Sequence, residues 1–156
     1  MLLKWILVIL HIITAAAWFG LGLRLAGQAR TVLSLDGEAQ ATLAEDGQQS
    51  VWLMNIFIVL TLVFSIGAFV AGGHFNVYGP VYHTSITLIV LLTLDQLFVI
   101  RPGWSTLLAH ATGRADAGAD AADSAKTRVA IGTGVGHLLW LVLLGLMFAN
   151  RLVGAF

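Results

Sequence analysis

The chain has 156 residues, of which 58% are hydrophobic and only 10% are charged, and its formal net charge at pH 7 is zero. A water-soluble domain carries about 25% charged residues, so this composition, with a mean hydropathy of +0.90, indicates an integral membrane protein. The balanced charge argues against a nucleic-acid partner, and a chain without cysteine has no disulfides, thiolate metal sites or cysteine-ligated iron–sulfur clusters.

Four apolar stretches are each long enough to cross the roughly 30 Å hydrocarbon layer of a bilayer as a helix. They cover approximately residues 5–25, 51–72, 80–100 and 129–149. Two long polar connections, residues 26–50 and 101–128, alternate with a short turn at residues 73–79. We therefore predict an all-α integral membrane protein, with residues 1–156 forming one up-down-up-down antiparallel four-helix transmembrane bundle.

The basic residues predict the orientation of this bundle. Six of them lie at the ends of the first and third spans or in the loops that follow, and two lie on the other side. This asymmetry places both long loops in the cytoplasm and both termini outside it. Trp5, Tyr78, Tyr82 and Trp104 lie near predicted span ends, where aromatic side chains are expected at the bilayer interfaces. The six basic residues are Arg24, Arg30, Arg101, Arg114, Lys126 and Arg128, and the two are Lys4 and Arg151.

Three histidines, His11, His83 and His137, lie inside predicted spans. A neutral imidazole in lipid has polar nitrogens to satisfy, so such residues usually face the bundle interior and often mark function. At about 1.5 Å per residue, His11 lies roughly 10 Å and His83 roughly 6 Å below the outer ends of their helices. These depths allow the two histidines to ligate a haem b between helices. They equally allow a structural role, in which both histidines form hydrogen bonds between helices.

The face of the first span that carries His11 also carries Ala15, Trp18 and Gly22 at helical spacing. The two small residues would let a flat ligand or another helix approach closely, and the indole of Trp18 would form a wall of the pocket. On the third span, Thr87 lies on the same helix face as His83. These residues are our candidates for the cofactor-binding site.

A second set of residues lies nearer the cytoplasmic ends of the spans. His137 and Asp95 are about eight and six residues from those ends, a similar depth that predicts a proton-handling site. Arg24 is the rival partner for Asp95. His137 is also a less favoured metal ligand for a second haem, with Met54 as its candidate partner on the second span. The Gly-x-x-x-Gly pattern at residues 132–136 predicts close helix packing.

The stretch LHIITAAAWFGLGLR, residues 10–24, resembles the first span of a group of bacterial membrane proteins. That group contains the haem-carrying, oxygen-independent protoporphyrinogen oxidases and the CopD-type copper-resistance proteins. The shared pattern is a histidine, a tryptophan seven residues later, then Phe-Gly and an arginine. A weaker match surrounds His83, where Ser85 replaces the lysine of the oxidases. The resemblance implies a helix bundle that binds haem b with His11 as a ligand. Because the lysine is absent, we assign haem binding to this chain but not the oxidation of protoporphyrinogen.

The leading hypothesis is a membrane b-type haem protein of the bacterial inner membrane, with one haem b held by His11 and His83. It would transfer electrons, or oxidise or reduce a quinone-like or porphyrin-like partner, with a quinone or another membrane redox protein as its partner in the bilayer. One alternative is a non-enzymatic accessory subunit of a larger homo- or hetero-oligomeric membrane complex. Another is permeation of copper or another small solute.

Overall fold

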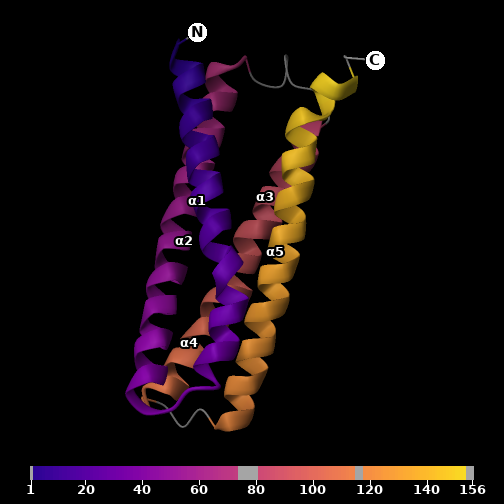
Figure 1. Ribbon diagram of the computed structural model, residues 1–156. Helices are drawn as coiled ribbons and strands as arrows, with labels where there is room; N and C mark the ends of the chain where they lie inside the picture. Colours follow the sequence, from indigo (N-terminus) through magenta and orange to yellow (C-terminus); the bar gives the residue numbers. More distant parts are fainter. Residues whose placement is uncertain (1, 74–80, 115–117, 154–156) are drawn as a thin grey trace.

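The computed structural model describes residues 2–73, 81–114 and 118–153, and the described chain is almost entirely helical. Figure 1 shows the long helices assembled into a bundle, which confirms the predicted all-α fold. The predicted turn at residues 73–79, apart from Gly73, and the predicted interface residue Tyr78 lie outside the described residues. The elements are α1 (Leu2–Val32), α2 (Gly37–Ala71), α3 (Val81–Asp95), the π-helix η2 (Gln96–Ile100), α4 (Arg101–Ala111) and α5 (Ala119–Val153).

Four helices in the described chain are long and apolar enough to cross a membrane. Most of their large hydrophobic side chains point outward, as lipid-facing residues do. The chain is therefore a multi-pass membrane protein. α1 has 31 residues and α2 has 35, which at about 1.5 Å per residue gives lengths of about 47 and 53 Å. Both exceed the roughly 30 Å of hydrocarbon, so one end of the bundle extends beyond the bilayer.

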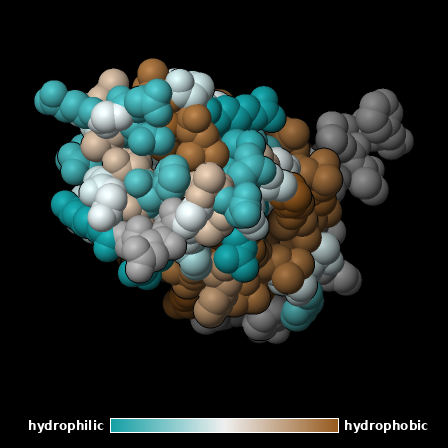
Figure 2. Space-filling model, turned by 90° about the horizontal axis from the view of Figure 1, so that it is seen from below, coloured by the Kyte–Doolittle hydropathy of each residue, from teal (hydrophilic) through white to brown (hydrophobic). Residues whose placement is uncertain are grey.

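The extended end is polar. Figure 2 views the bundle from the end at which α1 passes into α2, and hydrophilic residues cover much of this surface. We call this end, made of residues 24–50, 101–114 and 118–128, the polar cap. The predicted polar connections 26–50 and 101–128 are thus largely helical: α1 and α2 extend into the first, and α4 and α5 occupy most of the second. The cause lies in their Ala-rich composition and in buried small residues such as Ala44 and Gly47, whose spacing suits a helix.

The tightest packing of the polar cap surrounds Trp104 on α4. Its side chain is fully buried, and its Nε1 donates a hydrogen bond of 3.0 Å to the backbone carbonyl of Ala44 on α2. The indole lies against Gly47, because a β-carbon on that glycine would come within 1.8 Å of the ring. The prediction that Trp104 anchors at the bilayer interface is wrong, since α4 folds against α2 and takes the indole inside.

The helices pack in two pairs within the membrane-spanning part. α1 packs along α2, and α3 packs along α5, with α1 also contacting α5. Figure 1 shows the two pairs closest together near the polar cap and farther apart toward the end at which α1 begins. Contacts between the pairs are therefore concentrated at the middle of the bundle and at the cap, which decides where a site between all of the helices can form.

Candidate functional site

His11 is oriented by a hydrogen bond between α1 and α2. Its Nδ1 lies 3.2 Å from the backbone carbonyl oxygen of Thr61. A carbonyl oxygen can only accept a hydrogen bond, so Nδ1 is the donor, and the neutral ring keeps its lone pair on Nε2. The Thr61 hydroxyl in turn donates to the hydroxyl oxygen of Thr14 at 3.1 Å. This network presents Nε2 of His11 as the nitrogen available to accept a proton or bind a metal.

The side of α1 that carries His11 turns toward the other helices. Ala15 is half-buried, and Trp18 is only 7% exposed. Gly22 is buried at the point where α1 meets α5, and a β-carbon there would lie 3.2 Å from Nε2 of His137. The small residues predicted on this face therefore do permit a close approach, and the neighbour they admit at Gly22 is a histidine of α5.

His83 lies apart from this face. It is exposed on α3, and Thr87 one turn later is also exposed and donates a hydrogen bond to the backbone carbonyl of His83. α3 packs against α5, and α1 packs against α2 and α5. The described contacts do not bring His83 to His11, so their pairing as axial ligands stays a prediction.

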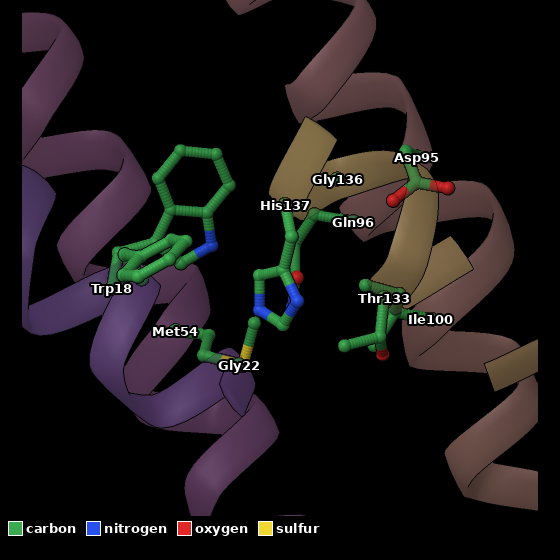
Figure 3. A pocket seen from close by; sticks show the side chains of 10 residues that line it. Trp18, Gly22, Met54, Asp95, Gln96, Ile100, Thr133, Gly136 and His137 are labelled. Atoms are coloured by element: carbon green, nitrogen blue, oxygen red, sulfur yellow. The ribbon is translucent and has the colours of Figure 1, made fainter. Parts of the chain in front are cut away.

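The helices do converge on a pocket in the middle of the bundle. Asp95 and His137, predicted at similar depth, both line it, and so does Met54. Arg24, the predicted rival partner of Asp95, is exposed on α1 and does not contribute to the lining. Figure 3 shows His137 reaching from α5 toward Gly22. The lining residues are Trp18, Phe19, Gly22, Met54, Asp95, Gln96, Ile100, Thr133, Gly136 and His137.

Three buried polar atoms in this pocket have no hydrogen-bond partner in the described structure: Gln96 Oε1, Thr133 Oγ1 and His137 Nε2. A buried polar atom left without a partner costs about 1–3 kcal/mol. The amide nitrogen of Gln96 donates to Asn55 Oδ1 on α2 at 3.1 Å, so the orientation of this amide is defined. Sequence reasoning did not select Gln96 or Thr133 for the site, although a polar residue inside an apolar span is a usable signal.

The glycines of α5 allow Asp95 to lie against the helix backbone. A β-carbon on Gly132 would come within 2.9 Å of Val99 Cγ1 and 3.1 Å of Asp95 Oδ1, and one on Gly136 within 3.4 Å of Asp95 Oδ2. The close packing predicted from the Gly-x-x-x-Gly pattern is confirmed. The π-helix η2 begins directly after Asp95, and such wider turns occur frequently at functional sites.

Aromatic side chains close the pocket toward α1. The ring of Phe19 meets the imidazole of His137 edge to face, with centroids 5.0 Å apart, and stacks on Trp140 at 4.2 Å. These contacts hold His137 between α1 and α5 and surround it with apolar surface. The imidazole is therefore a polar group in a largely aromatic setting, and Trp18 lies across from it on α1 (Figure 3).

The size of the pocket limits what it can hold in this conformation. Its volume is about 20 Å³, close to the space that one water molecule needs. A haem does not fit into this space in this conformation, and the second haem at His137 and Met54 stays a prediction. Among the described residues, no group of three or more His, Asp or Glu side chains could hold a metal ion.

Comparisons of the chain with protein-family models, with curated proteins and with solved structures gave no match.

Proposed function

We propose that this chain is a membrane b-type haem protein that carries electrons, in which His11 would be one of the residues that hold the haem. The observation that supports this most directly is the hydrogen bond from His11 Nδ1 to the Thr61 carbonyl. Histidines that ligate metals characteristically donate their other ring nitrogen to a carbonyl or carboxylate, which fixes the ring and directs the ligating nitrogen. The resemblance of residues 10–24 to haem-carrying membrane proteins supports the same assignment.

His83 would be the second histidine that holds the haem. It lies on the other helix pair, and the two pairs separate toward the end of the bundle where α1 begins (Figure 1). Ligation by both histidines requires that the pairs approach each other around the macrocycle, with Ala15, Trp18, Gly22 and Thr87 as neighbouring residues. The bound haem would supply one-electron redox chemistry, and the protein would supply ligation, orientation and a water-poor environment. A quinone or a membrane redox protein would be the electron partner.

The orientation and location are also part of this proposal. The six basic residues named above as cytoplasmic belong to the polar cap, whereas Lys4 and Arg151 lie toward the opposite end of their helices. By the positive-inside rule, the polar cap would face the cytoplasm of a bacterial cell, and both termini would lie on the other side of the inner membrane.

The test is a dithionite-reduced minus oxidised visible spectrum of the protein purified in detergent after expression with haem precursors supplied. We expect the sharp α-band of a low-spin haem b, lost in His11→Ala and in His83→Ala. His110→Ala, which removes a histidine of the polar cap, is the matched control and should keep the band. Added imidazole should restore the band in His11→Ala, because it replaces the missing ligand.

The outcomes separate the parts of the proposal. A colourless wild-type protein would overturn the haem assignment and favour the accessory-subunit alternative. A band that survives in His11→Ala would show that the ligand lies elsewhere. A band lost in His11→Ala but kept in His83→Ala would retain His11 and refute His83 as the second ligand.

A further inference from the structure

The pocket in the middle of the bundle collects polar atoms that the proposed haem site does not use. Gln96 and Thr133 are 1% and 4% exposed, and each has an unpartnered oxygen in the described structure. His137 Nε2 is the third such atom. Because the Gln96 amide nitrogen is committed to Asn55, the oxygen Oε1 is the end of the amide that remains to accept a hydrogen bond.

One water molecule can satisfy all three atoms. A buried water requires at least about 10–15 Å³ of space and two to four polar partners, and the pocket offers about 20 Å³ and three unpartnered atoms. The water would donate hydrogen bonds to Gln96 Oε1 and to the lone pair of His137 Nε2. It would accept one from the hydroxyl of Thr133, which can serve as donor or acceptor.

Asp95 gives this hydrated pocket an exchangeable proton. The titratable side chains among the lining residues are Asp95, from α3, and His137, from α5, and none of the described lining residues is a lysine or an arginine. α1 contributes Trp18, Phe19 and Gly22, and α2 contributes Met54, none of which is charged. An ionised carboxylate in apolar surroundings without a cation is costly, and a bound proton removes that charge.

We propose that the pocket between α1, α2, α3, η2 and α5 is a hydrated proton-binding site, in which one water bridges Gln96, Thr133 and His137 and Asp95 carries the proton. Proton binding forms an O–H bond on an Asp95 carboxylate oxygen and breaks an O–H bond of a hydronium ion, which leaves as water. The bonding electron pair stays on the water oxygen, and no electron is transferred. The site does not depend on a haem.

Infrared spectroscopy of the purified protein in lipid tests this assignment directly. A protonated carboxyl group has a carbonyl stretch above the amide I band, and this band should be present in the wild-type protein and absent in Asp95→Asn. Asp123→Asn is the matched control, because Asp123 is an exposed residue paired with Lys126 in the polar cap. The control should leave the band unchanged.

Two further variants test the bridging water. Thr133→Val keeps the shape of the side chain and removes a partner of the water, so the carboxyl band should shift. Gly22→Ala places a methyl group 3.2 Å from His137 Nε2 and should shift it too, whereas Gly20→Ala meets nothing within 4 Å and should not. Helix content and apparent melting temperature, from circular dichroism, show whether each variant folds.

Several results would overturn the proposal. One is the absence of a protonated-carboxyl band in folded wild-type protein between pH 5 and 8, and another is persistence of that band in Asp95→Asn. A band that responds to sodium concentration at constant pH would identify a cation site in place of a proton site. These measurements do not require bound haem. They therefore test the proton-binding site even if the purified protein is colourless and the haem assignment fails.

Discussion

Gly47 is the position at which the structure makes its sharpest energetic prediction. A methyl group added there would lie 1.8 Å from Cζ2 and 2.5 Å from Cε2 of Trp104. Both distances are far shorter than van der Waals contact, and the indole is fully buried with its Nε1 bonded to the Ala44 carbonyl. Gly47→Ala therefore forces the tryptophan to move and to give up this hydrogen bond.

The expected loss of stability follows from three contributions. Overpacking of a core costs about 1–3 kcal/mol, and leaving a buried donor without its acceptor costs about 1–3 kcal/mol. The higher helix propensity of alanine returns up to about 1 kcal/mol. The middle of each range together gives a loss of about 3–4 kcal/mol in the free energy of unfolding for Gly47→Ala, which corresponds to roughly 6–16 °C in melting temperature for a chain of this size.

The assay is the apparent melting temperature in one detergent at one scan rate, followed by far-ultraviolet circular dichroism. Gly27→Ala is the matched control, because a β-carbon on this exposed glycine of α1 meets nothing within 4 Å. The control should be as stable as the wild type or up to about 1 kcal/mol more stable. Trp104→Leu replaces the indole with a smaller side chain, so adding Gly47→Ala to this variant should destabilise the protein much less than Gly47→Ala alone. The effects of the two substitutions on stability should therefore be strongly non-additive.

A melting temperature of Gly47→Ala equal to that of Gly27→Ala would refute this reasoning. It would mean that α2 and α4 are not packed as closely as described, or that the indole has space into which it can turn. Additive effects in the double variant would likewise contradict direct contact between the two positions.

Three other predictions concern helix contacts. Gly132→Ala should lower the free energy of unfolding by about 1–3 kcal/mol because it overpacks the contact between α5 and η2. Gly134→Ala is the control and should cause no loss of stability in thermal melting, because its added β-carbon meets nothing within 4 Å. Thr14→Val removes the hydrogen bond to Thr61 and should cost about 1 kcal/mol; an unchanged melting temperature would contradict it. Lys126→Ala breaks an exposed ion pair with the aspartate one turn earlier and should cost less than about 1 kcal/mol, a difference that vanishes in high salt.

Hydropathy was sufficient to predict the class of fold. Each of the four predicted spans corresponds to a long apolar helix, because an unbroken apolar stretch in lipid must satisfy its backbone hydrogen bonds internally. It was insufficient for the polar cap. Segments such as 37–50 are polar on average, and only the spacing of buried residues such as Ala44, Gly47 and Val51 shows that they are helical.

The depth of residues along the helices predicted one site better than the other. Asp95 and His137 line the same pocket, as their similar depth suggested. His11 and His83 also have similar depth, but depth does not specify which helices are neighbours or how far apart the helix pairs lie. Packing between pairs depends on small residues such as Gly22, whose position against His137 could not be assigned without the fold.

The π-helix η2 lies between α3 and α4 and changes the relative orientation of side chains on these two helices. Asp95 and Trp104 are nine positions apart, and in an uninterrupted α-helix nine residues turn through about 900°, which places them on opposite sides. A wider turn absorbs one extra residue, so the net rotation falls by about 100°. This lets the carboxylate meet α5 while the indole meets α2. Deleting a single residue from 96–100 would leave eight positions in a regular α-helix, which also turn through about 800°, so the carboxylate and the indole should keep their relative orientation while η2 is lost.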